Sequence, residues 1–243
     1  MYISPIAVVF NLEGVPTLNL DAATIAKIFD GKITKWNDAA IAALNDGVTL
    51  PDSTIVPVHR SDDSGTTKNF TDYLEKASDG AWGYEADGVW PISGGESGEG
   101  TSGLIDVVSS TPGTIAYADA SKAGSLGIVS IKVGDAFNAP SAAGAAATLT
   151  ASERKEGNGA NDITFDVART TTDTAAYPLL LLSYAIVCQS YEDAAVAANV
   201  TGFLSYVAST EGQDSAAAAA GSAPLPADLS AEIETILAGI AGA

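Results

Sequence analysis

Residues 59–67 read His-Arg-Ser-Asp-Asp-Ser-Gly-Thr-Thr, and they are the most informative stretch of this sequence. The residues before it, 53–58, are rich in β-branched side chains and predict a strand. Residues 68–74 follow with the spacing of an amphipathic helix. The stretch therefore marks a junction at which a strand ends and a helix begins.

The same stretch is rich in hydrogen-bond donors. A helix start presents unpaired backbone N–H groups and a partial positive charge. Ser64, Thr66 and Thr67 add hydroxyl groups, and Gly65 lets the backbone approach a ligand closely. Arg60 adds a planar set of donors that suits a tetrahedral oxyanion. This pattern predicts a site for an oxyanion.

Helix capping is the alternative interpretation of this pattern. Ser, Thr and Asp before a helix are ordinary N-caps, and a cap uses the same atoms as an anion site. The spacing alone favours neither interpretation. Arg60 favours the anion site, because a cation beside a helix start opposes the helix dipole unless an anion lies between them.

Length, hydrophobic content and charge limit the kinds of protein that this sequence can form. The chain has 243 residues, 47% of them hydrophobic, which is enough for one large globular domain or two lobes. Its 11 basic and 30 acidic residues give a net charge of −19. Such a chain repels nucleic acid, so we expect no nucleic-acid partner. Any anion site must work through short-range, aligned donors.

Other residues that could carry chemistry are few. Cys188 follows the apolar run 179–187, which we expect to be a buried strand with the thiol buried as well. The single histidine, His59, lies at the strand end beside Arg60, and we expect a packing or polar-edge role for it instead of catalysis. There is no His/Cys cluster for a transition metal. We therefore expect no catalytic residue, no metal and no cofactor. Residues 1–5 lack the charged start and apolar core of a signal peptide.

Strands and helices alternate along the chain, which predicts an α/β fold. The periodicity predicts strands at 3–11, 114–117 and 177–188, and helices at 21–29, 39–44, 101–109, 141–150, 190–209, 214–221 and 227–238. Residues 82–100 and 155–162 are expected to be loops. The glycines near residue 98 lack the spacing and the lysine of a P-loop.

Five segments in order resemble the phosphate-binding protein of the bacterial phosphate ABC transporter, a periplasmic binding protein of type II. They are residues 4–11, 28–38, 59–67, 113–117 and 223–226. The Arg and Ser-Gly-Thr of the third segment are the specific part. The resemblance implies a two-lobed α/β fold and capture of inorganic phosphate for a membrane ABC permease. It also implies a periplasmic or extracellular cell-surface location.

The resemblance also implies roles for individual residues. Arg60, Ser64, Gly65 and Thr66 correspond to the residues that hold phosphate in that family. Asp62 corresponds to the aspartate that orients the arginine. Asp63 stands where glycine is frequent, and we expect its side chain to point outward.

The implied domains are a hinge strand at 1–11, a second lobe at 12–175, and a second hinge strand with the remainder of the first lobe at 176–243. Family members normally carry a further N-terminal segment, with most of the first lobe and an aspartate that faces the phosphate. We expect this sequence to lack that segment. We therefore expect weak phosphate binding, poor rejection of sulfate, and an exposed apolar patch or self-association that covers it.

Three alternatives stay open at this stage. The ligand could be another oxyanion, such as sulfate or molybdate. The protein could scavenge or sense phosphate without a transporter. It could also be an enzyme that processes phosphate esters, although the sequence offers no metal cluster, no P-loop lysine and no nucleophile paired with a base.

Overall fold

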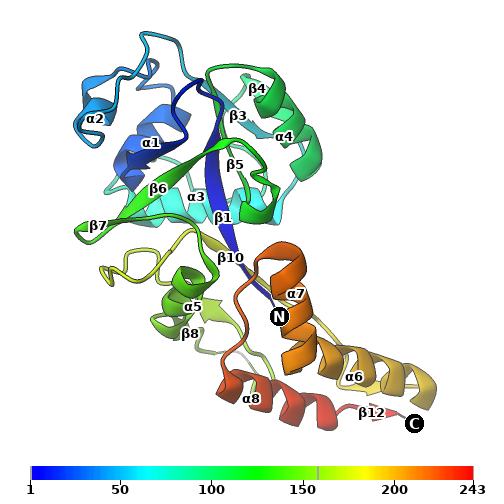
Figure 1. Ribbon diagram of the computed structural model, residues 1–243. Helices are drawn as coiled ribbons and strands as arrows, with labels where there is room; N and C mark the ends of the chain where they lie inside the picture. The colour runs from blue at the N-terminus through cyan, green and yellow to red at the C-terminus, as the bar shows by residue number, and fades with distance from the viewer. Residues whose placement is uncertain (1, 158, 243) are drawn as a thin grey trace.

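The longest strand, β1 (Tyr2–Phe10), connects the two parts of the molecule in the computed structural model, which describes residues 2–157 and 159–242. Its second half pairs antiparallel with β5 (Thr114–Asp119), and its first half pairs antiparallel with β10 (Leu180–Ser183). Figure 1 shows β1 running from the sheet at the top into the helical lower part.

The main sheet has the order β2-β6-β1-β5-β3-β4, with β10 paired to β1 and β7 to β6. β3 lies parallel to both β5 and β4, whereas β1 is antiparallel to β5. The further strands are β2 (Thr17–Leu20), β3 (Val56–Arg60), β4 (Glu96–Gly98), β6 (Gly127–Val133) and β7 (Ala136–Asn138). The helices beside this sheet are α1 (Ala22–Phe29), α2 (Ala39–Ala42), α3 (Gly65–Ala77) and α4 (Gly100–Ser110).

Both faces of the sheet are covered, which explains the unbroken apolar run in β1. Successive side chains of a strand point to opposite faces. Val8 and Phe10 pack in one hydrophobic cluster with Phe70 of α3, and Ala7 and Val9 pack in a second cluster under α4. A strand buried on both faces needs apolar residues at every position.

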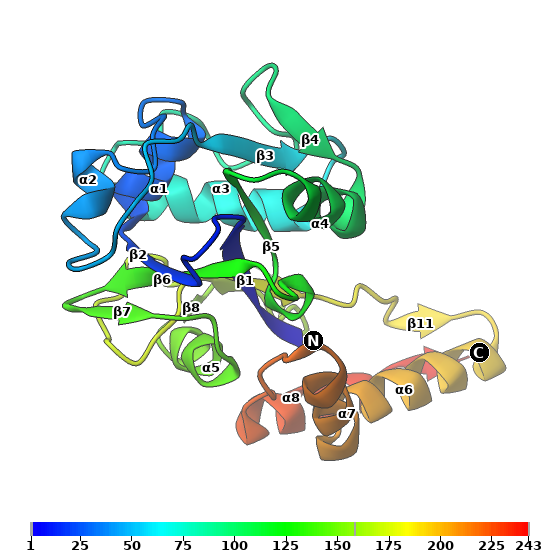
Figure 2. The ribbon, with the colours of Figure 1, turned by 45° about the horizontal axis from the view of Figure 1, so that its top comes forward.

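The lower part is mainly helical. It contains α5 (Ala142–Thr150), α6 (Ala194–Ala208), α7 (Thr210–Ala220) and α8 (Ala227–Ala238), with the short strands β8 (Glu153–Arg154), β9 (Phe165–Asp166), β11 (Ser190–Tyr191) and β12 (Ala241–Gly242). α6 and α8 pack together and extend away from the sheet (Figure 2). No helix among residues 2–157 and 159–242 is long and apolar enough to cross a membrane.

The predicted helix ends agree best with the observed ones where residues beside the helix end carry a capping or breaking signal. Asp21 caps α1 by accepting from Thr24 N at 2.7 Å, and α8 has the predicted bounds. α2 is shorter than predicted and ends at Ala42. α7 begins earlier than predicted, because Ser209 Oγ accepts from Gly212 N at 3.1 Å and caps it. The α/β class is as predicted.

The prediction of a buried strand over 177–188 is wrong beyond Ser183. β10 ends at Ser183, which is opposite Tyr2 in the register with β1. Without a partner strand the apolar run leaves the core, and Ile186 is 96% exposed. Cys188 is also exposed, contrary to the prediction of a buried thiol.

Candidate functional site

The turn between β3 and α3 has the strand-to-helix geometry that its sequence predicts. β3 ends at Arg60, and α3 begins at Gly65 with Ser64 as its N-cap. Ser64 Oγ accepts from Thr66 N at 3.2 Å and from Thr67 N at 3.4 Å. These bonds are long, and a hydroxyl that accepts can still donate its own proton. The cap therefore leaves a donor at the start of the helix.

Arg60 and Asp62 form a bidentate ion pair within the turn. Arg60 Nε donates to Asp62 Oδ1 at 2.8 Å and Nη2 donates to Oδ2 at 2.5 Å. Asp62 Oδ1 also accepts from the backbone N–H of Gly100, the first residue of α4, at 3.0 Å. One carboxylate therefore fixes the plane of the guanidinium and joins the turn to a second helix start. The pair uses two of the five N–H donors that an arginine side chain carries.

Both members of the pair are held in their charged forms. The hydrogen bonding of the Arg60 guanidinium to Asp62 is the main cause that raises the pKa of Arg60. The hydrogen bond from Arg60, followed by that from the Gly100 amide, lowers the pKa of Asp62 below the ordinary aspartate range. The Asp62 charge is compensated locally, so the acidic residue does not remove the attraction of this turn for an anion.

Tyr117 of β5 lies behind the turn and supports it. Its hydroxyl is 2.8 Å from Thr67 Oγ1 and accepts from Arg60 N at 3.3 Å. The ring stacks on Phe70 of α3 with centroids 4.3 Å apart, and Tyr117 is 1% exposed. Burial raises the pKa of Tyr117, so the hydroxyl stays protonated at neutral pH. Sequence reasoning did not assign this residue to the site, although it ends the quoted segment 113–117.

Exposure differs along the turn in a way that suits a ligand. Ser64 and Thr67 are buried, Thr66 is half-buried, and Gly65 is exposed. A Cβ added to Gly65 would come no closer than 3.7 Å to another atom, Leu181 Cδ1. A methyl group would therefore fit beside the exposed Gly65 backbone without a clash.

Neighbouring residues take other roles. His59 stacks on Trp90 with centroids 5.2 Å apart, and its Nε2 lies 3.1 Å from Gly94 O, which confirms the expected packing role. Asp63 is exposed, and its Oδ1 would lie 2.1 Å from a Cβ added to Gly88, so the side chain packs against that glycine. Within the described part of the chain, no group of three His, Cys, Asp or Glu side chains could hold a metal ion.

The sequence profile of the PBP superfamily domain matches residues 1–211. The chain belongs to the PBP superfamily. Two superfamily relatives from Mycobacterium bovis (strain BCG / Pasteur 1173P2) are named as phosphate-binding proteins. PstS3 is 42% identical over 214 residues, which cover 82% of this chain and 55% of PstS3. PstS2 is 37% identical over 244 residues, which cover 94% of this chain and 62% of PstS2. The chain therefore spans little more than half the length of these relatives.

Solved structures of phosphate-binding proteins have a fold similar to that of this chain. A high-affinity periplasmic phosphate-binding protein, PfluDING, bound with phosphate, has a TM-score of 0.75 at 20% identity, covering 96% of this chain and 69% of that protein. A phosphate-binding protein from Stenotrophomonas maltophilia has a TM-score of 0.70 at 19% identity, covering 96% and 68%. At these identities the likeness shows the α/β fold of phosphate-binding proteins.

Proposed function

We propose that this chain binds inorganic phosphate and acts as the substrate-binding component of an ABC-type phosphate importer. The observation that carries the proposal is the turn after β3, where Arg60 is held by Asp62 beside the N-terminus of α3. The names of the PstS relatives support phosphate as the ligand.

The proposed contacts come from Arg60, the Ser64 hydroxyl, and the backbone amides of Gly65 and Thr66. Phosphate loses its water when it enters, and charge-assisted hydrogen bonds from aligned donors replace that water. The positive end of the α3 dipole adds attraction at short range. Short-range donors are required because the net charge of −19 repels an anion at a distance.

We also propose how the chain divides into lobes. Residues 1–11 and the start of the segment 176–243 cross between the parts as hinge strands, and residues 12–175 supply the lobe with the turn, although α5, β8 and β9 of that range lie in the lower part with α8. The pairing of β1 with β10 supports the hinge assignment, since both strands lie where the sheet meets the lower helices. Lobes joined by such strands can close around a ligand.

Selectivity between phosphate and sulfate is proposed to be poor in these 243 residues. At neutral pH phosphate still carries a proton and sulfate carries none, so rejection of sulfate needs a carboxylate that accepts that proton. Asp62 is committed to Arg60 and Gly100, and its lowered pKa makes it a weak acceptor.

Isothermal titration of the chain with phosphate and then with sulfate tests the proposal. We expect saturable binding of both anions, with affinities within about tenfold of each other, the equivalent of roughly one hydrogen bond. No binding of either anion would contradict the proposed function. Strong preference for phosphate would contradict only the proposal on selectivity.

A binding role is proposed in preference to an enzymatic one. Ser64 Oγ, the hydroxyl at the turn, accepts from backbone amides, and His59 contacts Trp90 and Gly94 instead of that hydroxyl. A nucleophile needs a base within hydrogen-bond reach. We expect no hydrolysis of p-nitrophenyl phosphate above background, and turnover abolished by Arg60→Ala would contradict this.

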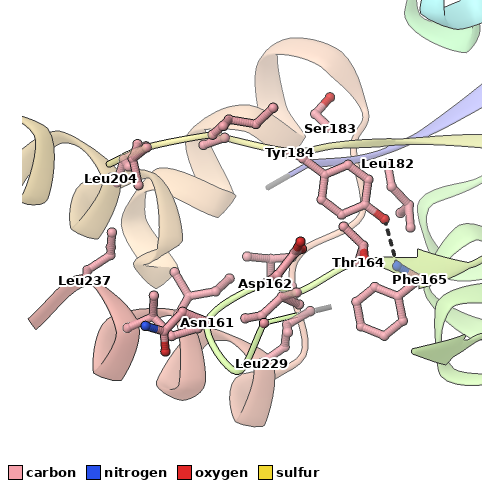
Figure 3. A pocket seen from close by; sticks show the side chains of 18 of the residues that line it. Asn161, Asp162, Thr164, Phe165, Leu182, Ser183, Tyr184, Leu204, Leu229 and Leu237 are labelled. Carbon is pink, nitrogen blue, oxygen red and sulfur yellow. Dashed lines mark hydrogen bonds between the residues drawn. The ribbon is translucent and has the colours of Figure 1, made fainter. Parts of the chain in front are cut away.

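The partners and the location are proposed from the same relatives. A substrate-binding component delivers phosphate to a membrane permease, and we propose the periplasm or the outer cell surface as its place. We also propose that copies of the chain associate through an apolar surface of the lower part. That surface surrounds a cavity of about 630 Å³ beside β10 and α8, lined by residues that include Leu182, Tyr184, Leu229 and Leu237 (Figure 3). Ile186, which also lines this cavity, is 96% exposed and supports the proposal.

A further inference from the structure

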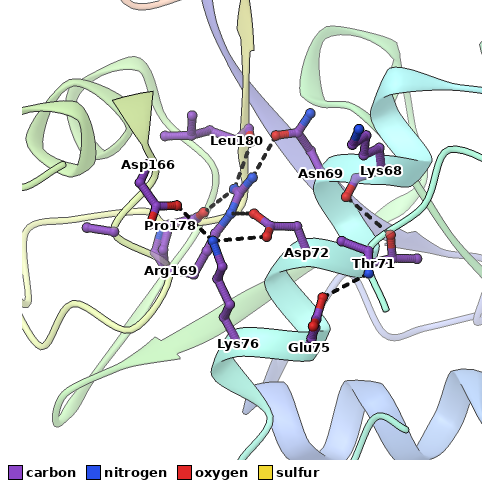
Figure 4. Close-up of polar contacts among 12 residues, drawn as sticks. Lys68, Asn69, Thr71, Asp72, Glu75, Lys76, Asp166, Arg169, Pro178 and Leu180 are labelled. Atoms are coloured by element: carbon purple, nitrogen blue, oxygen red, sulfur yellow. Dashed lines mark hydrogen bonds and ion pairs between the residues drawn. The ribbon is translucent and has the colours of Figure 1, made fainter. Parts of the chain in front are cut away.

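Arg169 is a buried arginine outside the proposed phosphate contacts. It follows β9 in the chain and is 3% exposed. Its guanidinium contacts two elements that are distant in sequence, helix α3 and the start of β10 (Figure 4). An arginine is costly to bury unless its donors are satisfied, so this placement requires a specific set of acceptors.

On one side Arg169 completes the edge of the strand. Alternate carbonyls of a strand point to opposite edges. Leu179 O accepts from Ile6 N of β1 at 2.9 Å, so the carbonyls of Pro178 and Leu180 point the other way. Arg169 Nη1 donates to Pro178 O at 2.7 Å and to Leu180 O at 2.9 Å. The guanidinium therefore takes the place of a neighbouring strand.

On the other side Arg169 contacts one face of α3. Its Nε donates to Asp72 Oδ2 at 2.8 Å, and its Nη2 donates to Asn69 Oδ1 at 2.6 Å. Lys76 pairs with Asp72 at 3.1 Å and with Asp166 at 2.8 Å. Two cations thus face two carboxylates, and the buried charge of Arg169 is compensated.

Asn69 continues this network to the anion turn. Its Nδ2 donates to Gly65 O at 2.9 Å, while its Oδ1 accepts from Arg169. Gly65 is the first residue of α3 and lies between Ser64 and Thr66. A path of two hydrogen bonds therefore runs from Arg169 through the Asn69 amide to the backbone whose N–H groups are the proposed phosphate donors.

We propose that Arg169 is a positioning residue for the anion turn, acting through Asn69. This inference rests on the proposed function. It assigns to the proposed phosphate site a residue that does not itself contact phosphate. Arg169 holds α3 against β10, and Asn69 fixes the Gly65 peptide, so that the amides of Gly65 and Thr66 keep their direction. Aligned donors bind an anion more strongly than donors that must be ordered on binding.

The test compares Asn69→Ala, Arg169→Lys and the double variant by phosphate titration and thermal unfolding. Asn69→Ala should weaken phosphate binding about three- to tenfold, the effect of one hydrogen bond, and should also lower the Tm of the free protein, because Arg169 Nη2 loses its acceptor. A lysine cannot reach all four acceptors, so Arg169→Lys should lower both the Tm and the affinity. The double variant should bind phosphate no more weakly than Arg169→Lys alone, because the two residues act in series.

Thr235→Ala is the matched control, since Thr235 Oγ1 also donates to the carbonyl four residues earlier, Ala231 O, but in α8. It should leave phosphate affinity unchanged. If the wild-type chain binds phosphate and Asn69→Ala binds it equally well, the positioning role is wrong, and this result stands even if Arg169→Lys does not fold. If the wild-type chain binds no phosphate, the proposed function itself is wrong. A lowered Tm without a change in affinity would show a purely structural role.

Discussion

At the scale of single residues, the turn depends on the ion pair of Arg60 and Asp62, whose two members have different roles. Arg60 keeps N–H donors beyond the two that Asp62 accepts, and Asp62 joins Arg60 to the first amide of α4. The arginine is therefore expected to contact phosphate, and the aspartate is expected to orient it.

Replacing Arg60 should separate binding from folding. Arg60→Ala removes charge-assisted hydrogen bonds to the anion and should weaken phosphate binding about tenfold to a hundredfold in isothermal titration. Arg154 is a suitable control, because it forms a bidentate pair with Glu232 in the lower part of the molecule. Equal loss of affinity in Arg154→Ala and Arg60→Ala would contradict the assignment.

Asp62 should give stability a specific dependence on pH. Its pKa is lowered in the folded state, chiefly by Arg60, so its contribution to stability is present above the ordinary aspartate pKa of about 4. That contribution is lost as the pH falls from about 4 through the lower folded-state pKa. Chemical unfolding at pH values from neutral downwards should show a shallower acid loss for Asp62→Asn than for the wild type. Parallel curves would show that Asp62 contributes nothing.

At the scale of elements, the N-cap of α3, Ser64, is also a proposed contact of phosphate. Ser64→Ala should lower the unfolding free energy by about 1 kcal/mol, as N-cap removal does, and should also weaken phosphate binding. Ser141 caps α5 by accepting from Gly144 N at 3.0 Å, so Ser141→Ala should have a similar cost with unchanged binding. Denaturation and titration of both variants separate the two roles, and unaltered phosphate binding by Ser64→Ala would leave Ser64 as a cap alone.

Gly65 tests whether the ligand approaches the backbone of the turn. An added Cβ meets only Leu181 Cδ1, at the ordinary contact distance of 3.7 Å, and alanine favours a helix more than glycine does. Gly65→Ala should therefore keep or slightly raise the Tm while it weakens phosphate binding. A variant that binds phosphate as the wild type does would mean that the anion does not approach here.

Local signals predicted the helices and the turn, and long-range contacts account for what was missed. Ser64 and Asp21 are N-caps that bond to amides within the next few residues. A short stretch of sequence is therefore enough to predict where α3 and α1 begin. β2 and β6 escaped prediction: β2 has only four residues, and the two strands pair with each other across the chain, Thr17 opposite Ile128. Asn69 and Arg169 are 100 residues apart, and no local pattern joins them.

At the scale of the whole molecule, the apolar surface of the lower part should govern association. Ile186 is 96% exposed and Phe203 is 67% exposed. Light scattering at rising protein concentration should show association that increases with salt, because salt screens the repulsion between chains of charge −19. Ile186→Ser with Phe203→Ser should reduce it, whereas Val48→Ser, at an exposed apolar residue of the sheet-containing part, should not. A monomer under all conditions would contradict the proposal.

Phosphate binding at the start of α3 can be observed at the residues concerned by amide NMR during a phosphate titration. We expect the backbone N–H resonances of Gly65 and Thr66 to move progressively and to saturate with the same dissociation constant as in calorimetry. The Arg60→Ala variant should lose this response. Saturable binding that leaves these two resonances in place, with shifts elsewhere in the chain, would show that phosphate binds at another site.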